Sequence, residues 1–338
     1  MRIGIAGVGR IGAFHAETLR NLADVDSLVL ADVQPGRAKE LAAALGADWA
    51  ETVDDLLSSN LDGFVVTAAT DAHADLIIRG VDRDIPVFCE KPVASDVAGT
   101  LAVVDRVNNS KVPVQIGFQR RFDAGYTAAR SAVASGRLGW VHTLRGGTLD
   151  PAPPPAAYIP TSGGIFRDCS VHDFDIIRWV TGREVTEVYA SGANRGADFF
   201  REAGDVDTAA ALLTLDDGAF AAVSATRYNG AGYDVRLEVL GSQDSISVGL
   251  DDRLPLASVE PGATFPAGQA YPGFMARFEA AYRRELSAFT DIVAGRAPVT
   301  CTVFDALEAF SIAEACELSR REHRPVRMDE VRVDGGMR

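Results

Sequence analysis

Short apolar runs alternate with longer amphipathic stretches over residues 1–117. This alternation predicts strand-helix-strand units and a parallel sheet. Because the runs are apolar on both faces, we expect helices to cover both sides of that sheet. The expected strands are Ile3–Ala6, Ser27–Ala31, Gly63–Val66, Ile85–Phe88 and Val112–Ile116, and the expected helices are Ile11–Leu22, Gly36–Leu45, Ala72–Val81 and Asp96–Asn108.

After Gly117 the pattern changes to longer stretches in which apolar and polar residues alternate. Such stretches predict half-buried strands, and the D-D-G turn at Asp216–Gly218 joins two of them, which favours a mainly antiparallel sheet. A helix at Ala124–Ser135, a rigid proline-rich loop at Asp150–Pro155 and a helix after Asp168 precede these strands. The expected strands are Glu187–Ala193, Thr208–Leu215, Ala219–Thr226 and Val235–Leu240, and the closing helices are Phe274–Val293 and Val303–Arg321.

The chain of 338 residues is long enough for two domains with full cores. We therefore predict an α/β protein with an N-terminal Rossmann dinucleotide-binding domain at residues 1–118. The predicted second domain, residues 119–338, is an α+β domain built on a large, mainly antiparallel sheet. Its terminal helices could pack back on the first domain.

Composition narrows the class of protein. The formal net charge of −14 disfavours a nucleic-acid partner, because binding to a phosphate backbone needs clustered Lys and Arg. No apolar run approaches the roughly 18 residues of a membrane-spanning helix, and the N-terminus lacks the features of a signal peptide. We therefore expect a cytoplasmic protein without a membrane partner, whose scattered cysteines are thiols: Cys89, Cys169, Cys301 and Cys316.

The stretch G-V-G-R-I-G matches the GxGxxG fingerprint and lies between an expected strand and an expected helix. In that fingerprint the first glycine permits a tight turn, the second lets the backbone approach a pyrophosphate, and the third allows close packing of helix on strand. The helix N-terminus then faces the phosphates. The expected cofactor-binding residues of this motif are Gly7, Gly9, Arg10, Ile11 and Gly12.

Asp32 follows the second strand, 20 residues after Gly12, where an acidic residue binds the adenine ribose hydroxyls. Its carboxylate would repel the additional phosphate of NADP, so we predict NAD as the cofactor. Arg37 would admit NADP if its side chain folded back toward that phosphate.

Two further motifs carry ionisable groups. Lys91, in F-C-E-K-P, follows an expected strand of the first sheet, and ligands of such sheets bind at the carboxyl ends of the strands. Asp168 and His172 are four residues apart in D-C-S-V-H-D-F-D, which places them on one face of a helix, one turn apart. Histidine has the unperturbed pKa best suited to a general base near neutral pH.

Alternatives to catalysis remain for several of these side chains. Asp168, Cys169, His172 and the distant His142 are plausible metal ligands, but no paired His-x-x-x-His or close Cys-His set supports a metal, so we predict none. Asp175 could cap the helix or pair with Arg178 at its surface, and a structural role is also favoured for Asp173 over a contact with substrate. We expect His15 and His73 to be packing or loop residues and His323 to be solvated.

Taken in order along the chain, four motifs resemble those of the glucose-fructose oxidoreductase/inositol dehydrogenase (Gfo/Idh/MocA) family. They are the glycine motif, Glu90-Lys91-Pro92, G-F-Q-R-R-F-D at Gly117–Asp123, and D-C-S-V-H-D-F-D at Asp168–Asp175. The resemblance extends through G-Y-D-V-R-L-E-V-L-G at Gly232–Gly241 and the terminal helices, and within the family it is greatest to inositol 2-dehydrogenases. One departure is Ala68-Ala69, where the family often has Thr-Pro.

The resemblance implies an NAD-dependent enzyme that oxidises a secondary hydroxyl of a cyclic polyol, with myo-inositol and its 2-keto product as the expected pair. It implies that Lys91, Asp168 and His172 are catalytic, that Glu90 and Lys91 also contact NAD, and that Arg120 and Tyr233 line the substrate pocket together with the catalytic residues. It further implies a homo-oligomer, often a tetramer, built through the open face of the second sheet. The loops at Asp150–Pro155 and Tyr158–Gly164 are expected to border the pocket.

Three other functions stay open at this point. The enzyme could act on another inositol isomer or an aldose, because the sequence does not reveal which hydroxyl the pocket presents. It could hold NAD tightly and recycle it internally, as some members of the family do. A sensor that binds NAD without catalysis is disfavoured, because it would not need Lys91, Asp168 and His172 together.

Overall fold

The structure is a computed structural model, and its described residues are 1–266 and 268–332. Contacts divide the chain into two compact units. The first comprises Met1–Phe122 and Ala280–Leu307, and the second comprises Asp123–Glu279 and the residues from Glu308 onward. The predicted domain boundary between residues 118 and 119 stays a prediction. Each unit is described by itself.

The first unit contains a parallel sheet with the strand order β3-β2-β1-β4-β5-β6. This is the order of doubly wound dinucleotide-binding folds, so the α/β class and the Rossmann prediction are confirmed. The strands are β1 (Arg2–Ala6), β2 (Ser27–Ala31), β3 (Asp48–Trp49), β4 (Gly63–Val66), β5 (Val87–Glu90) and β6 (Val114–Gly117). The helices are α1 (Arg10–Arg20), α2 (Arg37–Leu45), α3 (Val53–Leu57), α4 (Thr70–Val81), α5 (Val97–Asn108) and the 3-10 turn η1 (Gln119–Phe122).

The predicted strands and helices of this unit are confirmed, with ends that differ by at most two residues. The pattern did not predict β3 and α3, which are too short to show periodicity. The core is formed by buried residues of β1, β2, β4 and β5, including Ile5, Leu30 and Phe88. Leu286 and Phe289, from the later part of α9 (Phe274–Val293), join the same cluster.

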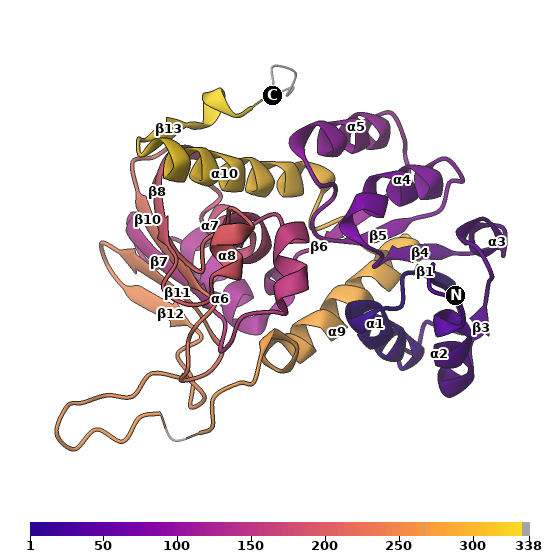
Figure 1. The fold of residues 1–338 in the computed structure, drawn as a ribbon, viewed down its shortest axis with the longest axis horizontal. Coiled ribbons are helices and arrows are strands. Elements are labelled where there is room, and N and C mark those ends of the chain that lie inside the picture. The colour runs from indigo at the N-terminus through magenta and orange to yellow at the C-terminus, as the bar shows by residue number, and fades with distance from the viewer. Residues whose placement is uncertain (267, 333–338) are drawn as a thin grey trace. The chain divides into compact units, whose positions relative to one another are not determined.

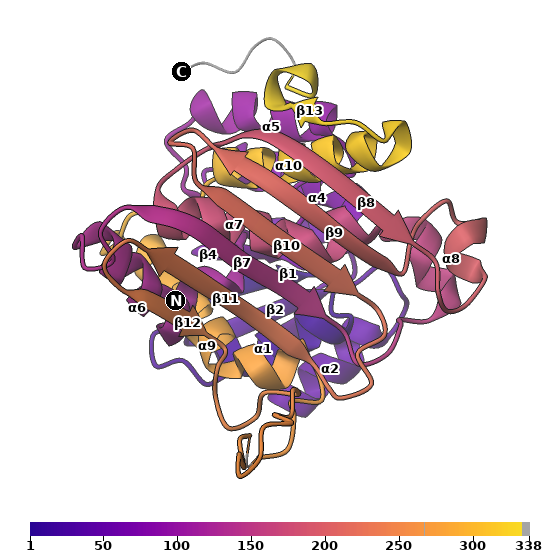
Figure 2. The same cartoon turned by 90° about the vertical axis from the view of Figure 1, so that its left-hand side faces the viewer.

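The second unit is built on a sheet with the order β12-β11-β7-β10-β9-β8-β13 (Figures 1 and 2). Its neighbouring strands are antiparallel except β7 and β10, which run parallel, so the prediction of a mainly antiparallel sheet is confirmed. The strands are β7 (Val141–Leu149), β8 (Val185–Ala193), β9 (Thr208–Leu215), β10 (Phe220–Thr226), β11 (Asp234–Gly241), β12 (Ser245–Val248) and β13 (Val326–Arg327). The helices are α6 (Ala124–Ala134), η2 (Ala156–Thr161), the π-helical turn η3 (Phe166–Ser170), α7 (Val171–Thr181), α8 (Phe199–Glu202), α10 (Val303–Glu322) and η4 (Met328–Glu330).

Strand β7 lies inside this sheet, yet the sequence pattern did not predict it. Its residues V-H-T-L-R-G-G-T-L include Gly146 and Gly147, which interrupt the alternation of apolar and polar residues. A Cβ at Gly147 would lie 2.8 Å from the backbone oxygen of Ser224, so the close approach of β10 accounts for this glycine.

One face of the second sheet is covered and the other is open. Along β9 and β10 every second residue is buried, whereas the residues between them are exposed. Figure 2 shows α7 behind the strands, and none of the described helices of this unit in front of them. The open face presents Tyr189, Leu212 and Phe220, which are each 45–48% exposed. None of the described helices is both long enough and apolar enough to cross a bilayer.

Candidate active site

The glycine motif forms the turn between β1 and α1, and the surroundings that a side chain would meet differ at each of its three glycines. Gly7 has a φ of +89°, and a Cβ there would lie 2.4 Å from the Cα of Ala68. A Cβ at Gly12 would lie 1.9 Å from the carbonyl oxygen of Gly7, so only glycine lets α1 pack against this turn. At Gly9 a Cβ would meet no atom within 4 Å. Packing therefore explains Gly7 and Gly12, and open space remains beside Gly9.

Helix α1 begins at Arg10, and no side chain caps its N-terminus. Its first N–H groups therefore point toward the space beside Gly9 without a capping side chain. An uncapped helix N-terminus next to such a space is suited to a phosphate group. These features fit the pyrophosphate of a dinucleotide.

Asp32 follows β2 and is tied to the same turn. Its Oδ2 accepts a hydrogen bond from the backbone N of Val8 at 2.8 Å, and its Oδ1 accepts one from the backbone N of Gln34 at 2.8 Å. The guanidinium of Arg37 lies 3.4 Å from the carboxylate. The carboxylate is thus oriented beside the glycine motif, and the arginine that could have admitted NADP is paired with it.

The end of β5 carries Glu90 and Lys91. Oε1 of Glu90 lies 2.7 Å from Nε2 of His15, a fully buried residue of α1. This pair joins α1 to the end of β5, which confirms the prediction that His15 is a packing residue. Burial and the neighbouring Glu90 raise the pKa of the buried Cys89 thiol. Lys91 is partly exposed and follows at the carboxyl end of the strand.

His73 supports the loop after β4, which contains Ala68 and Ala69. It is buried in α4, with Nδ1 2.7 Å from the carbonyl oxygen of Pro92 and Nε2 3.0 Å from that of Ala68. Backbone atoms of the loop are thereby held to the segment that carries Lys91. The prediction that His73 is a packing or loop residue is confirmed.

In the second unit, Asp168 lies in the π-helical turn η3 that leads into α7. Its Oδ1 accepts a hydrogen bond from the hydroxyl of Tyr158 at 3.0 Å, and its Oδ2 accepts one from Nη2 of Arg227 at 2.6 Å. Nη1 of the same arginine donates to Oδ2 of Asp150 at 2.9 Å. The carboxylate is thus held from two directions by groups far from it in sequence.

The two donors to Asp168, Tyr158 and Arg227, both have raised pKa values in this environment. Burial, the charge of Asp168 and the hydrogen bond to it all raise the pKa of Tyr158. Burial acts to lower the pKa of Arg227, but electrostatic interactions with Cys169, Asp168 and Asp150 and the hydrogen bond to Asp168 outweigh it and raise the pKa. Arg227 therefore stays positively charged, and it is only 4% exposed.

His172 lies in the first turn of α7, four residues after Asp168, as predicted. The surface position expected for Asp175 is wrong, whereas the structural role favoured for Asp173 stays a prediction. Asp173 is 1% exposed and accepts a hydrogen bond from the hydroxyl of Thr148 at 2.7 Å, and Asp175 is 0% exposed. Arg178 is also buried, and it forms two hydrogen bonds of 2.7 Å to Glu184. Helix α7 packs against both α6 and β7, which explains why nearly all its sides are buried.

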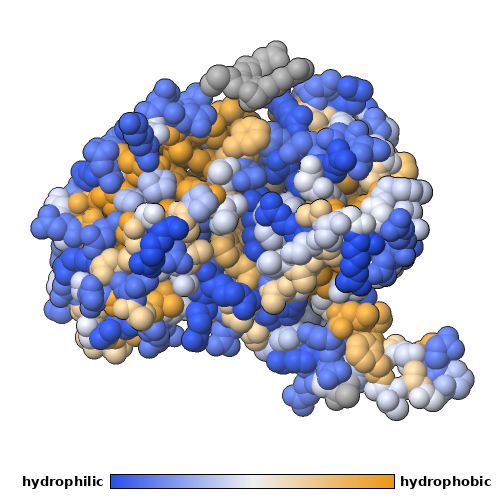
Figure 3. All heavy atoms as spheres, turned by 180° about the vertical axis from the view of Figure 1, so that it is seen from behind, coloured by the Kyte–Doolittle hydropathy of each residue, from blue (hydrophilic) through white to orange (hydrophobic). Residues whose placement is uncertain are grey.

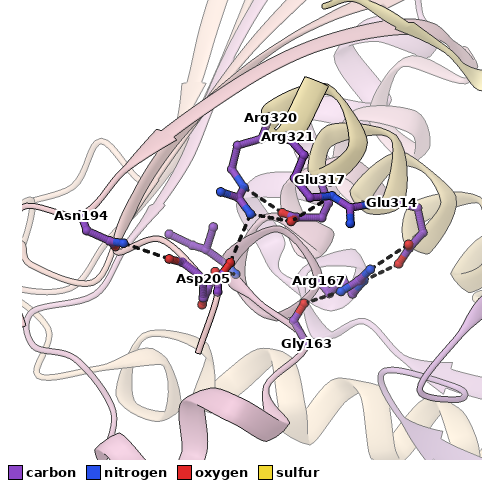
Figure 4. Close-up of polar contacts among 10 residues, drawn as sticks. Gly163, Arg167, Asn194, Asp205, Glu314, Glu317, Arg320 and Arg321 are labelled. Atoms are coloured by element: carbon purple, nitrogen blue, oxygen red, sulfur yellow. Dashed lines mark hydrogen bonds and ion pairs between the residues drawn. The ribbon is translucent and has the colours of Figure 1, made fainter. Parts of the chain in front are cut away.

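A second set of contacts holds the segment that carries Asp168 (Figure 4). Gly163 and Gly164 have φ values of +81° and +92°, and the turn they make leads into η3. The backbone N of Ile165 donates to Oδ1 of Asp205 at 3.0 Å, and Arg167 pairs with Glu314 of α10 through two hydrogen bonds. The segment is therefore anchored at both ends by buried or half-buried polar groups.

Arg320 contacts the chain beside Asp205, at the preceding residue Gly204. Nη2 of Arg320 donates to the carbonyl oxygen of Gly204 at 3.2 Å while the guanidinium pairs with Glu317 (Figure 4). Burial raises the pKa of Asp205, although backbone hydrogen bonds from Ile165 and Val206 oppose the shift.

Arg120 and Tyr233 are the remaining residues predicted for the substrate pocket. Arg120, in η1 directly after β6, is 1% exposed and belongs to the first unit. Tyr233 precedes β11 in the second unit, is 5% exposed, and its backbone N donates to the carbonyl oxygen of Tyr271 at 3.0 Å. Their roles in substrate binding stay predictions.

Sequence reasoning missed Arg227 and the part that Asp150 plays with it. Asp150 follows β7 and Arg227 follows β10. The pattern did not reveal that these two strands pair, because β7 was not predicted. Tyr158 was expected only as a loop residue at the pocket. The one signal available was the position of Arg227 just before the N-G-A-G-Y-D turn.

Other sites have less chemistry to offer. In the first unit a cavity of about 290 Å³ is lined mainly by apolar residues of α5, the start of β6 and residues 299–304. It lies at the amino ends of the strands, away from the glycine motif, and Lys111 is its only charged lining residue among those described.

In the space-filling view from behind, apolar and polar side chains are intermixed over the visible face (Figure 3). Within the described part of the chain, no three His, Cys, Asp or Glu residues are grouped so as to hold a metal ion.

Comparison with known proteins agrees with this geometry. Residues 1–118 match the family model described as an oxidoreductase family with an NAD-binding Rossmann fold, and residues 126–247 match the GFO/IDH/MocA C-terminal domain. The chain is 38% identical to a myo-inositol dehydrogenase from Streptomyces leeuwenhoekii, over 94% of this chain and 97% of the relative.

Two solved structures have the same fold. A probable dehydrogenase from Thermotoga maritima has a TM-score of 0.92 and 34% identity, and the match covers 98% of this chain and 100% of that one. A scyllo-inositol dehydrogenase from Lactobacillus casei, with bound NAD(H) and scyllo-inositol, has a TM-score of 0.89 and 27% identity over 97% of this chain and 99% of that one.

Proposed function

Because the chain belongs to the Gfo/Idh/MocA family of oxidoreductases with an NAD-binding Rossmann fold, we propose that it is an inositol dehydrogenase. The proposed reaction oxidises a secondary ring hydroxyl of myo-inositol to the 2-keto inosose, with NAD as the oxidant. The observation that carries this proposal is 38% identity to a myo-inositol dehydrogenase over 94% of the chain. The ionisable residues that such a reaction requires are present in this chain.

NAD, when bound, accepts the hydride that leaves the carbon bearing the hydroxyl. We assign its pyrophosphate to the turn at Gly9, where the N-terminus of α1 has no capping side chain. The carboxylate of Asp32, oriented by Val8 and Gln34, would bind the adenine ribose hydroxyls. The proposed cofactor-binding residues are Gly7, Gly9, Arg10, Ile11, Gly12, Asp32, Glu90 and Lys91.

Removal of the hydroxyl proton is assigned to His172. Imidazole is the side chain whose protonation changes near neutral pH, and it can take that proton as hydride leaves. The carboxylate of Asp168 favours the imidazolium that forms and can also bind a neighbouring hydroxyl. Lys91 would hydrogen-bond the reacting oxygen and stabilise the negative charge that develops on it. Arg120 and Tyr233 are proposed to contact the rest of the substrate ring.

The direct test is the absorbance of reduced nicotinamide when purified protein meets NAD or NADP with myo-inositol, scyllo-inositol and common aldoses. We expect turnover with NAD and an inositol. Lys91→Ala and His172→Asn are expected to abolish turnover and to leave NAD affinity within about tenfold of wild type. The matched controls are the exposed residues Lys39→Ala and His323→Asn, which should remain active. Normal activity of either active-site variant would contradict the assignment.

We further propose that the enzyme is a homo-oligomer, a tetramer, that uses the open face of the second sheet. Support comes from the exposed Tyr189 and Leu212, which are paired across β8 and β9, and from Phe220 on β10. An apolar face of this kind is typical of a surface covered by another subunit. We propose that the enzyme acts in the cytoplasm, since its four cysteines are buried and form no disulfide among the described residues.

A further inference from the structure

The parallel pair β7 and β10 brings two charged residues together at its carboxyl end. Leu149 and Thr226 are paired in the register, and the next residues in the chain are Asp150 and Arg227. The backbone N of Asp150 donates to the carbonyl oxygen of Thr226 at 2.9 Å, and that of Arg227 donates to the carbonyl oxygen of Asp207 at 2.8 Å. The backbone position from which the Arg227 side chain extends is therefore fixed by hydrogen bonds at the end of the sheet.

From this position the buried guanidinium of Arg227 reaches two carboxylates. It donates from Nη1 to Asp150 and from Nη2 to Asp168, at 2.9 and 2.6 Å, and the arginine side chain is only 4% exposed. Hydrogen bonds between ionised partners are the stronger class, and burial strengthens them further. The planar fork of arginine fixes direction as well as distance.

Both oxygens of Asp168 accept hydrogen bonds, Oδ2 from Arg227 and Oδ1 from the hydroxyl of Tyr158. A carboxyl group that accepts at both oxygens is stabilised in its ionised form. The two donors also set the rotation of the carboxylate about its side-chain bonds. Whatever Asp168 does for His172 or the substrate depends on this rotation.

We infer that Arg227 is a positioning residue, which keeps Asp168 ionised and correctly rotated during turnover. This inference rests on the proposed function, in which Asp168 is a catalytic residue. Arg227 acts through Asp168, and Asp150 acts by holding the second arm of the guanidinium. Tyr158 restrains the other oxygen of the same carboxylate.

The charged groups around Asp168 determine how the removal of Arg227 should change the protonation of the Asp168 carboxyl. Helix α7 and strands β7 and β10 pack against η3, and they contribute His172, Asp150 and Arg227. Tyr158 of η2 adds a neutral donor, α7 also carries Asp173 and Asp175, and Asp205 accepts a hydrogen bond from the backbone N of Ile165 in the same segment. Arg227 is a cation in this set, and its Nη2 donates a hydrogen bond directly to the carboxylate. Without it, the remaining negative charges favour the protonated carboxyl.

The test is a double-mutant cycle on the full-length enzyme with NAD and myo-inositol. Arg227→Met is expected to lower kcat on the order of tenfold to hundredfold, the range for directly coupled neighbours. It is also expected to move the acidic limb of the pH profile to higher pH. In an Asp168→Asn background the same change should lower kcat by less than about threefold, because the group through which Arg227 acts is already neutral. Losses that multiply in the double variant would overturn the inference.

Two further variants separate positioning from folding. Arg227→Lys retains the cation without the fork, so it should recover part of kcat and most of the acidic limb even if Arg227→Met folds poorly. Arg183→Met is the matched control, because that arginine lies on the surface and pairs with Asp217. NAD affinity and urea unfolding of each variant show whether the protein is intact. A pH profile of a folded Arg227→Met enzyme that superimposes on wild type contradicts the inference.

Failure of the proposed function can be told apart from failure of this inference. If wild type oxidises no polyol or sugar with NAD, the proposed function is wrong. Crystal structures of wild type and Arg227→Met then test the positioning itself. A carboxylate of Asp168 that keeps its rotation and its hydrogen bond to Tyr158 without Arg227 would refute it, and a rotated carboxylate would support it.

Discussion

Alanine in place of each glycine of the G-V-G-R-I-G turn should separate folding from cofactor binding. At Gly12 a Cβ would lie 1.9 Å from the carbonyl oxygen of Gly7, which is a backbone atom and cannot move alone. At Gly7 a Cβ would lie 2.4 Å from the Cα of Ala68, and the φ of +89° is unfavourable for alanine. At Gly9 a Cβ would meet nothing within 4 Å, and its φ of −66° is ordinary.

These distances set the expected magnitudes. Overpacking of this kind lowers the free energy of unfolding by about 1–3 kcal/mol, which is the expectation for Gly12→Ala. Gly7→Ala adds about 1–2 kcal/mol for a positive φ to the same kind of clash. Gly9→Ala should leave the free energy of unfolding within about 0.5 kcal/mol of wild type. Its new methyl group occupies the space assigned to pyrophosphate, so NAD affinity should fall at least tenfold, or about 1.4 kcal/mol.

The assays are urea unfolding without cofactor, followed by circular dichroism, and calorimetric titration of each variant with NAD. Because the chain has two units, the unfolding comparison uses the transition that includes the first unit. The reasoning would be refuted by a Gly9→Ala protein that is as unstable as Gly12→Ala, or by one that binds NAD as wild type does. A stable Gly12→Ala protein would refute the packing explanation.

Three other changes have defined outcomes. Tyr158→Phe removes one hydrogen bond to Asp168, and since a bond to a charged group is worth about 1.5–3 kcal/mol, kcat should fall roughly tenfold or more with NAD affinity retained; an unchanged kcat would contradict this. Asp32→Ser releases Arg37 from its ion pair and should raise kcat/KM for NADP relative to NAD by at least about tenfold, and an unaltered ratio would show that Arg37 does not reach the phosphate. Leu212→Glu places a charge on the open sheet face, and light scattering should then report a smaller species than wild type, whereas an unchanged mass would place the interface elsewhere.

Much of the first unit was predictable because its information is local. Ile3–Ala6 and Ser27–Ala31 are apolar on both faces, and only a strand covered on both sides accommodates such short runs. The turn at Gly7–Gly12 follows the first of them, so its place at the carboxyl end of the sheet followed from chain order alone. Asp32, Glu90 and Lys91 follow strands of the same sheet and reach the same edge for the same reason.

The second unit was predictable in class but not in detail. Alternation along Thr208–Leu215 and Ala219–Thr226 predicted half-buried antiparallel strands, and both were confirmed. The pattern missed β7, where Gly146 and Gly147 interrupt the alternation and Gly147 permits the close approach of β10. Asp175 was predicted at a helix surface, because single-helix reasoning does not include the elements that bury α7.

The sequence by itself determined most strands and helices of the first unit, the glycine turn with its acidic partner, and the spacing of Asp168 and His172. These depend on periodicity and on residues close together in the chain. Only the tertiary structure decided what surrounds Asp168. Arg227 is 59 residues away and Tyr158 lies in η2, after the proline-rich loop. They meet one carboxylate because β7 and β10 pair in parallel and η3 contacts both strands. Pairing of distant strands is a property of the folded chain, and it leaves no periodic signal in the sequence.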